Sequence, residues 1–249
     1  MKYEAFDDYF WAGQNCMKNL LDIHNQIELD DVVNKMAMAG LYDLQMTSVP
    51  EKFNARFLKS VHKTLFGQVY DWAGEYRVCP MARNTTYADP HEISDKIDMF
   101  CQSFEREFLE KEFEQVSDMG WELAKQWGVL NKIHPFRDGN GRSQFGFFHA
   151  ACRAKGCILE PQMRDMKSLR QARDAASEGR SELLGGILTR SLKMSPELVE
   201  RDKMLLGKGD VGRFMNISDG VSIDARKTLK NLTDALFENG EDKDLNIEL

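Results

Sequence analysis

The chain has 249 residues, of which 42% are hydrophobic and 29% are charged, a composition typical of a globular protein with a well-buried core. A formal net charge of -7 argues against the basic surface that direct nucleic-acid binding requires. The first residues lack the basic segment and apolar run of a secretory signal, and no apolar run approaches a membrane span in length. We therefore expect a cytoplasmic protein without membrane contact, with delivery as a secreted effector as the alternative.

The cysteines predict reduced thiols, because five of them form an odd set without CxxC spacing. The histidines outside position 134 form no metal-ligand spacing with them. The five cysteines are Cys16, Cys79, Cys101, Cys152 and Cys157.

Helical spacing dominates the first half of the chain. An acidic helical pattern covers about residues 12–39, and residues 48–51, with Pro50 near the first turn, predict the start of another helix. Residues 91–114 and 119–132 also follow helical spacing. Between these helices, residues 77–90 alternate weakly and are broken by Pro80, Asn84 and Pro90, which predicts a short β-hairpin or flap.

The most informative stretch is Ile133-His134-Pro135-Phe136-Arg137-Asp138-Gly139-Asn140-Gly141-Arg142. His134 is the side chain in it that can accept a proton near neutral pH, and Asp138 offers the hard oxygen that Mg²⁺ prefers. Gly139 and Gly141 let backbone N–H groups approach an anion, and Arg142 adds a cation. Asp-Gly and Asn-Gly pairs also form ordinary turns, but the ordered combination favours nucleotide chemistry over a plain turn.

A helix is predicted over residues 143–155, directly after this run. Phe145, Phe148 and Cys152 follow i, i+3, i+4 spacing, so we expect them on one buried face. Gly156 is a plausible C-terminal cap. The glycine turn then lies at a helix N-terminus, whose unpaired N–H groups and positive dipole suit phosphate. Residues 196–249 predict a small helical appendage, and the glycine cluster at 207–212 lacks the preceding strand of a phosphate loop.

Residues 134–142 closely resemble the signature HxFx(D/E)GNGRxxR of the Fic (filamentation induced by cAMP) family, and residues 64–77 resemble the second recognisable block of that family. The resemblance covers about residues 50–190. It implies an all-α fold, a Fic-type helical bundle with a short β-hairpin flap. The expected organisation is an N-terminal helical segment (1–49), the Fic domain (50–195) and the appendage (196–249).

The resemblance also implies an activity, the transfer of AMP from Mg·ATP to a Ser, Thr or Tyr hydroxyl of a target protein. His134 would deprotonate that hydroxyl, Phe136 would pack in the core, and Asp138 would bind Mg²⁺. The nucleotide phosphates would be held by Gly139, Asn140, Gly141 and Arg142. The flap would dock the target backbone as an added strand, through Val78, Cys79, Met81, Thr85, Thr86 and Tyr87. The phosphate-transferring Doc type carries Lys before the arginine, where this chain has Gly141.

The chain departs from the family pattern at one position, because Phe145 replaces the second arginine. In the family that arginine contacts the distal phosphates and pairs with an inhibitory glutamate of an [S/T]xxxE[G/N] helix. The nearest matches to this helix, residues 174–179 and 234–239, carry Asp where Ser or Thr belongs. Inhibition would then come from a separate antitoxin-like protein or be absent, and homo-oligomer formation is left open. The alternatives are another nucleotide donor, removal of AMP, or a catalytically silent protein-binding module.

Overall fold

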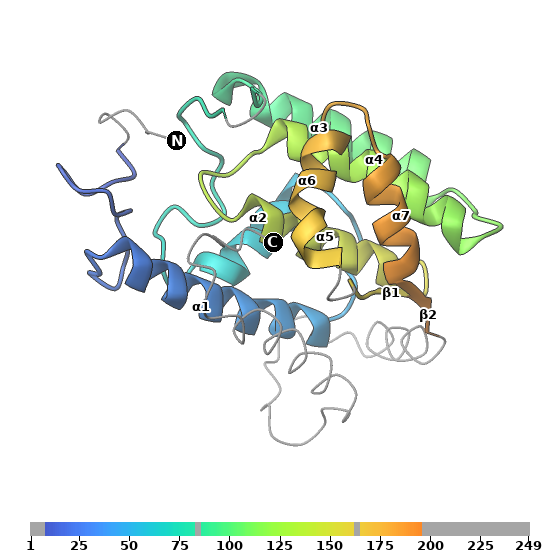
Figure 1. The fold of residues 1–249 in the computed structure, drawn as a ribbon, viewed down its shortest axis with the longest axis horizontal. Helices are drawn as coiled ribbons and strands as arrows, with labels where there is room; N and C mark the ends of the chain where they lie inside the picture. Colours follow the sequence, from blue (N-terminus) through green and yellow to red (C-terminus); the bar gives the residue numbers. More distant parts are fainter. Residues whose placement is uncertain (1–7, 83–85, 162–164, 196–249) are drawn as a thin grey trace, which may run out of the picture.

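A computed structural model describes residues 8–82, 86–161 and 165–195, and these residues are mostly helical (Figure 1). The all-α prediction is confirmed, with short 3₁₀ and π segments at Pro90–Glu92 (η1) and Glu105–Leu109 (η2). The α-helices are α1 (Gln26–Met46), α2 (Ala55–Phe66), α3 (Ile93–Phe104), α4 (Val116–Ile133), α5 (Asn140–Ala154), α6 (Met166–Ala176) and α7 (Glu182–Ser191).

A two-stranded antiparallel sheet joins β1 (Cys157–Leu159) to β2 (Leu192–Met194), with Ile158 opposite Lys193. The sequence did not predict it, because three-residue strands are too short to show a readable alternation. The appendage predicted for residues 196–249, including its glycine cluster and the segment 234–239, lies outside the described residues.

The first predicted helix was placed too early. The side chain of Asn25 accepts hydrogen bonds from the N–H groups of Ile27 and Glu28, which starts α1 at residue 26. Residues before it form turns, with an isolated bridge between Phe10 and Met17. The helix start predicted at residues 48–51 was also wrong, since Asn54 caps α2 three residues after that segment.

Helix α5 runs through the middle of the molecule (Figure 1) and is buried along nearly its whole length. Its Phe147 packs edge-on against Phe53, and its Phe148 packs against Trp127 of α4 with ring centroids 4.7 Å apart. Helices α2 and α4 both contact α5. The N-terminus of α5 is therefore held by a closely packed core, which makes it a rigid platform for a site.

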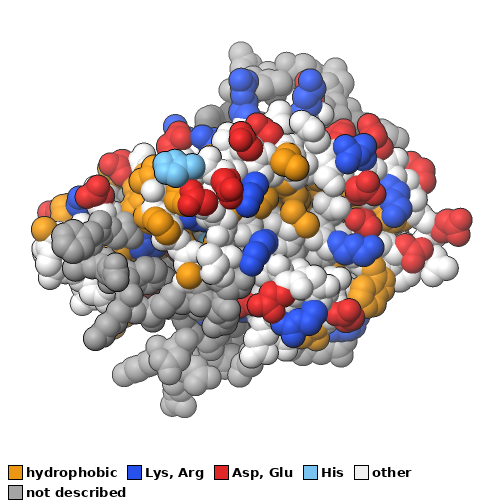
Figure 2. All heavy atoms as spheres, turned by 90° about the horizontal axis from the view of Figure 1, so that it is seen from above, with side chains coloured by type: hydrophobic (Ala, Val, Ile, Leu, Met, Phe, Trp, Pro, Cys, Tyr) orange, Lys and Arg blue, Asp and Glu red, His pale blue; other side chains and the backbone are white. Residues whose placement is uncertain are grey.

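One face of the molecule carries acidic and basic side chains interspersed over the surface (Figure 2). Both signs of charge are abundant in the sequence, with 33 Lys and Arg against 40 Asp and Glu. Among the helices of residues 8–82, 86–161 and 165–195, none combines the length and apolarity needed to cross a bilayer.

Candidate active site

The loop between α4 and α5 begins with His134, which ends α4 in the left-handed conformation at φ 51°. Its N–H donates to the carbonyl of Leu130 at 3.1 Å, and its Nδ1 lies 3.3 Å from the carbonyl oxygen of Asn131. Because a carbonyl oxygen only accepts, this contact assigns the ring proton to Nδ1. Nε2 then carries the lone pair and is the ring atom that can accept a proton.

Asn140 closes the loop on itself through two reciprocal hydrogen bonds with Phe136. The N–H of Phe136 donates to Asn140 Oδ1 at 2.9 Å, and Asn140 Nδ2 donates to the carbonyl of Phe136 at 2.8 Å. Both residues are buried. The side chain of Asn140 therefore shapes the loop, and any phosphate contact of this residue would come from its backbone N–H.

His62 of α2 contacts the loop through its ring. Its Nδ1 accepts a hydrogen bond from the N–H of Gly74 at 2.9 Å, which leaves Nε2–H to donate to the carbonyl of Asp138 at 3.1 Å. The ring stacks on Phe136 with centroids 3.9 Å apart. Burial lowers the pKa of His62 to about 4, so the ring is neutral near pH 7. The structure thus shows His62 as a buried ring that fixes the loop backbone.

Helix α5 starts at Asn140, three residues earlier than predicted, and Gly139 precedes it at φ 72°. A Cβ at position 139 would lie 2.3 Å from the ring of Phe66, so both the backbone conformation and the space require glycine. Intrahelical bonding begins with Ser143 N–H donating to the carbonyl of Gly139. The earlier N–H groups of this turn have no intrahelical acceptor and form a potential anion site.

Asp138 and Arg142 lie together beside this turn. Arg142 Nη2 donates to Asp138 Oδ2 at 3.2 Å, and Arg142 Nη1 donates to Oδ1 of Asn34 at 2.9 Å. The guanidinium also lies 4.7 Å from the ring centroid of Phe66. Asn34 was missed by sequence reasoning, because it is 108 residues away on α1 and no local pattern marks it. Within the described residues, Arg142 Nε is buried without a hydrogen-bond partner.

In the flap, an isolated antiparallel bridge joins Ala82 and Thr86. Val78 and Thr86 are exposed, while Cys79 and Met81 are half-buried. The predicted docking residue Thr85 lies outside the described residues. Tyr87, also predicted to dock a target, is buried, and its ring stacks on His134.

Arg77 joins the flap to the signature loop and is 1% exposed. Its Nη1 donates to the carbonyl of Cys79 and its Nη2 to that of Ala88, at 2.7 and 2.6 Å. Its Nε donates to the carbonyl of His134 at 2.8 Å. One buried cation therefore holds both ends of the flap against the residue that ends α4.

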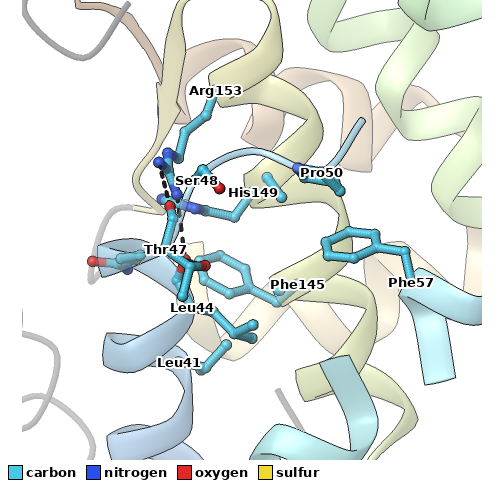
Figure 3. Close-up of a pocket in the computed structure, with 12 residues that line it drawn as sticks. Leu41, Leu44, Thr47, Ser48, Pro50, Phe57, Phe145, His149 and Arg153 are labelled. Carbon is cyan, nitrogen blue, oxygen red and sulfur yellow. Dashed lines mark hydrogen bonds between the residues drawn. The ribbon is translucent and has the colours of Figure 1, made fainter. Parts of the chain in front are cut away.

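Phe145 is buried, as predicted, but it faces α1 rather than the aromatic group around Phe148. Figure 3 shows it beside Leu41 and Leu44, and its ring lies 5.8 Å from that of His149. The position of the second family arginine is thus filled by an apolar ring, in a pocket whose lining also includes the polar side chains of Thr47, His149 and Arg153. Glu178, in the segment that most nearly matches the inhibitory motif within the described residues, is exposed and pairs with Arg180.

This geometry defines a class of protein: a helical domain with a base, a carboxylate and an arginine around a helix N-terminus. Residues 52–152 match the family model described as Fic/DOC family. The sequence resemblance is confirmed, and the chain contains a domain of the Fic/DOC family.

Similar proteins include the protein adenylyltransferase VbhT of Bartonella schoenbuchensis, 30% identical over 193 residues, which cover 77% of this chain and 40% of VbhT. The probable protein adenylyltransferase Fic of Escherichia coli K12 is 25% identical over 177 residues, which cover 71% of this chain and 87% of that protein. The chain spans 40% and 30% of the length of VbhT and of a second Bartonella relative.

Solved structures share the fold. BepC of Bartonella tribocorum with bound AMPPNP has a TM-score of 0.68 at 18% identity, over 78% of this chain and 100% of that chain. An N-terminal Fic domain from Bartonella quintana with bound ADP also has a TM-score of 0.68, at 20% identity, over 77% of this chain and 97% of that chain.

Proposed function

We propose that this protein is a nucleotidyltransferase that moves AMP from Mg·ATP to a Ser, Thr or Tyr hydroxyl of a target protein. The observation that carries the proposal is the position of His134, a base at the mouth of the loop that leads into the anion site at the N-terminus of α5. Relatives named protein adenylyltransferases support the chemistry. The fold neighbours crystallised with AMPPNP and ADP support a nucleotide as substrate.

The phosphates would lie against the backbone N–H groups of Asn140 and Gly141, where the helix dipole favours negative charge. Arg142 lies in the same turn, and its unpaired Nε is a buried donor that a phosphate oxygen would satisfy. Charge on the leaving pyrophosphate would thus meet a cation that is already held by Asn34 and Asp138.

The donor set fits Mg²⁺ bound mainly by phosphate and water. Within the described residues no group of three His, Cys, Asp or Glu side chains could hold a metal by itself, and one carboxylate is enough when phosphates complete the shell. Asp138 is that carboxylate, with its side chain 20% exposed. Bound Mg²⁺ would neutralise phosphate charge and orient the nucleotide.

The transfer step requires a target hydroxyl in line with the α-phosphorus. His134 Nε2 accepts the hydroxyl proton while the oxygen forms a bond to the α-phosphorus, and the bond from that phosphorus to pyrophosphate breaks. The carbonyl of Asn131, bound to Nδ1–H, stabilises the imidazolium that results. The flap would present the target backbone to this point, with Val78, Cys79, Met81 and Thr86 as docking residues.

The test is parallel incubation of the pure protein with cell extract and Mg²⁺, using ATP labelled on the α- or the γ-phosphate. We expect protein-bound label from the α position, its loss in His134→Ala, and its retention in the matched control His91→Ala, because His91 is exposed on another element. Label from the γ position alone would instead mean phosphate transfer. No label from either position would contradict ATP as donor.

A second candidate is the same fold acting with another nucleotide donor, and Phe145 is the observation that favours it. An apolar ring in this pocket cannot supply the cation that contacts distal phosphates in the family. A thermal-shift panel of ATP, ADP, CTP, GTP and UTP with Mg²⁺ tests this. Strongest stabilisation by a nucleotide other than ATP would favour the second candidate.

Regulation and location stay predictions. Phe145 leaves an inhibitory glutamate without its usual arginine, so we propose that inhibition comes from a separate antitoxin-like protein or is absent. Co-purification of a small partner whose helix carries the [S/T]xxxE[G/N] motif would support the first option. We also propose a cytoplasmic location, with delivery as a secreted effector as the alternative.

A further inference from the structure

Tyr87 covers one face of the proposed base. The rings of Tyr87 and His134 lie 3.8 Å apart between centroids at an interplanar angle of 5°, and Tyr87 is only 7% exposed. Parallel rings at this spacing make a full stacking contact. Such a contact hinders rotation of the imidazole out of its plane, and it does not block the ring nitrogens, which lie at the edge of the ring and of which Nδ1 contacts the carbonyl of Asn131.

The backbone around this pair is fixed by Arg77. Its Nη2 binds the carbonyl of Ala88, next to Tyr87, and its Nε binds the carbonyl of His134 itself, at 2.6 and 2.8 Å. A single planar guanidinium thus ties the backbone next to Tyr87 to the backbone of His134. Hydrogen bonds from a buried cation to carbonyls are among the stronger ones in proteins. Arg77 therefore restrains the backbone on which both stacked rings are carried.

Tyr87 also belongs to the returning side of the flap. Its N–H donates to the carbonyl of Met81 at 3.3 Å, and the bridge between Ala82 and Thr86 precedes it. A target strand that pairs with the flap would therefore restrain the same backbone that carries the stacked ring.

We infer that Tyr87 is a positioning residue for His134. Through this contact Tyr87 couples the target-docking flap to the base. This inference rests on the proposed function for its kinetic readout. The stack keeps Nδ1 on the carbonyl of Asn131 and so keeps Nε2 as the basic atom. Without it the imidazole can rotate, and the base is no longer aligned with the target hydroxyl.

The kinetic test compares Tyr87→Phe, which keeps the ring, with Tyr87→Ala, which removes it. The substrate is α-labelled Mg·ATP with cell-extract protein, at several ATP concentrations. We expect Tyr87→Phe to match the wild type within about twofold. We expect Tyr87→Ala to lower the maximal transfer rate about 10- to 100-fold, with the half-saturating ATP concentration nearly unchanged, because misplacement of a reacting group costs rate rather than nucleotide binding.

Leu184→Ala is the control for lost stability, since Leu184 is fully buried in α7. The neighbouring Gly185 packs on Trp121. Trp121 lies near the start of α4, at the opposite end of that helix from His134. Equal loss of rate in Leu184→Ala and Tyr87→Ala would overturn the inference. A Tyr87→Ala rate equal to the wild type, or an equal loss in Tyr87→Phe, would also overturn it.

An activity-free readout separates this inference from the proposed function. Nitrogen-15 NMR of the histidine rings, assigned by the His134→Ala variant, reports the tautomer of His134. We expect the Nδ1–H form in the wild type and in Tyr87→Phe, and a mixture of tautomers in Tyr87→Ala. If the wild type transfers no label, the proposed function fails, and an unchanged tautomer in Tyr87→Ala would separately overturn the role of Tyr87.

Discussion

At the scale of single residues, His62 couples the stability of the fold to pH. Its pKa is lowered by burial from 6.5 to about 4, so between these values the unfolded chain binds more protons than the folded chain. Stability is therefore complete above about pH 6.5 and falls as the pH drops toward 4. The total loss is about 3 kcal/mol.

The variant His62→Leu isolates this effect. It leaves the N–H of Gly74 and the carbonyl of Asp138 without their partner, and we expect a loss of about 2–4 kcal/mol at pH 7. The difference in unfolding free energy between wild type and variant should shrink from pH 6.5 to pH 4, measured by urea unfolding. The exposed His91→Leu is the control, and a constant difference across this range would refute the assignment.

Gly139 is required for two separable reasons, its positive φ and its contact with Phe66. We expect Gly139→Ala to cost about 2–4 kcal/mol, the sum of left-handed strain and displacement of the Phe66 ring. Gly179→Ala is the matched control, because Gly179 has φ 85° but nothing within 4 Å of its added Cβ, and it should cost about 1–2 kcal/mol. Urea unfolding measures both. Equal losses would show that the contact with Phe66 is relieved at no cost.

At the scale of elements, the site depends on the position of α1 relative to α5. Asn34 on α1 holds Nη1 of Arg142, and Arg153 on α5 donates to the carbonyls of Leu44 and Thr47 at the C-terminal end of α1. Two arginines of α5 thus bind α1, one near its middle and one at its C-terminal end. This arrangement keeps the Arg142 guanidinium beside Asp138 and the anion site.

Asn34→Ala tests this connection. It removes one hydrogen bond to a charged group, so we expect Mg·ATP affinity to fall about 3- to 10-fold as Arg142 loses its fixed orientation. Asn25→Ala is the control, since it removes the α1 cap and costs about 1 kcal/mol of stability without touching Arg142. Calorimetric titration compares the two. Unchanged affinity in Asn34→Ala would mean that Asp138 alone orients the arginine.

At the scale of the whole molecule, the distribution of thiols follows the core. The five cysteines are thiols that form no disulfide, and every one except Cys79 is buried. Burial raises the pKa of Cys101 to about 12 and raises that of Cys152 well above its ordinary value. Thiolate is the reactive form, so the buried cysteines should be inert in the folded protein.

A disulfide reagent such as DTNB should therefore titrate one thiol rapidly in the native protein and all five after denaturation. We expect Cys79→Ser to abolish the rapid phase, because Cys79 is half-buried in the flap. The matched variant Cys101→Ser should keep it. A rapid phase that survives in Cys79→Ser would show that another region opens in solution.

The helical class, the signature run at residues 134–142 and the flap could be predicted from the sequence, because each depends on local chemistry. The spacing of apolar residues predicts helices. Glycines beside a base and a carboxylate predict an anion-binding loop. Residues 134–142 could be recognised without any tertiary contact. The first residues of α1 and α2 could not be predicted correctly, since the asparagine that caps each helix is hard to distinguish in sequence from the turn residues before it.

The distant residues that contact the signature loop could not be predicted from the sequence, because tertiary packing brings them there. Asn34 reaches Arg142 across 108 positions, and His62 reaches the carbonyl of Asp138 across 76. Tyr87 was assigned to a target from its place in the flap, and the structure turns its ring onto His134. Such contacts follow from how packed helices bring distant segments together, and hydrogen bonds and ring stacking act only at that short range.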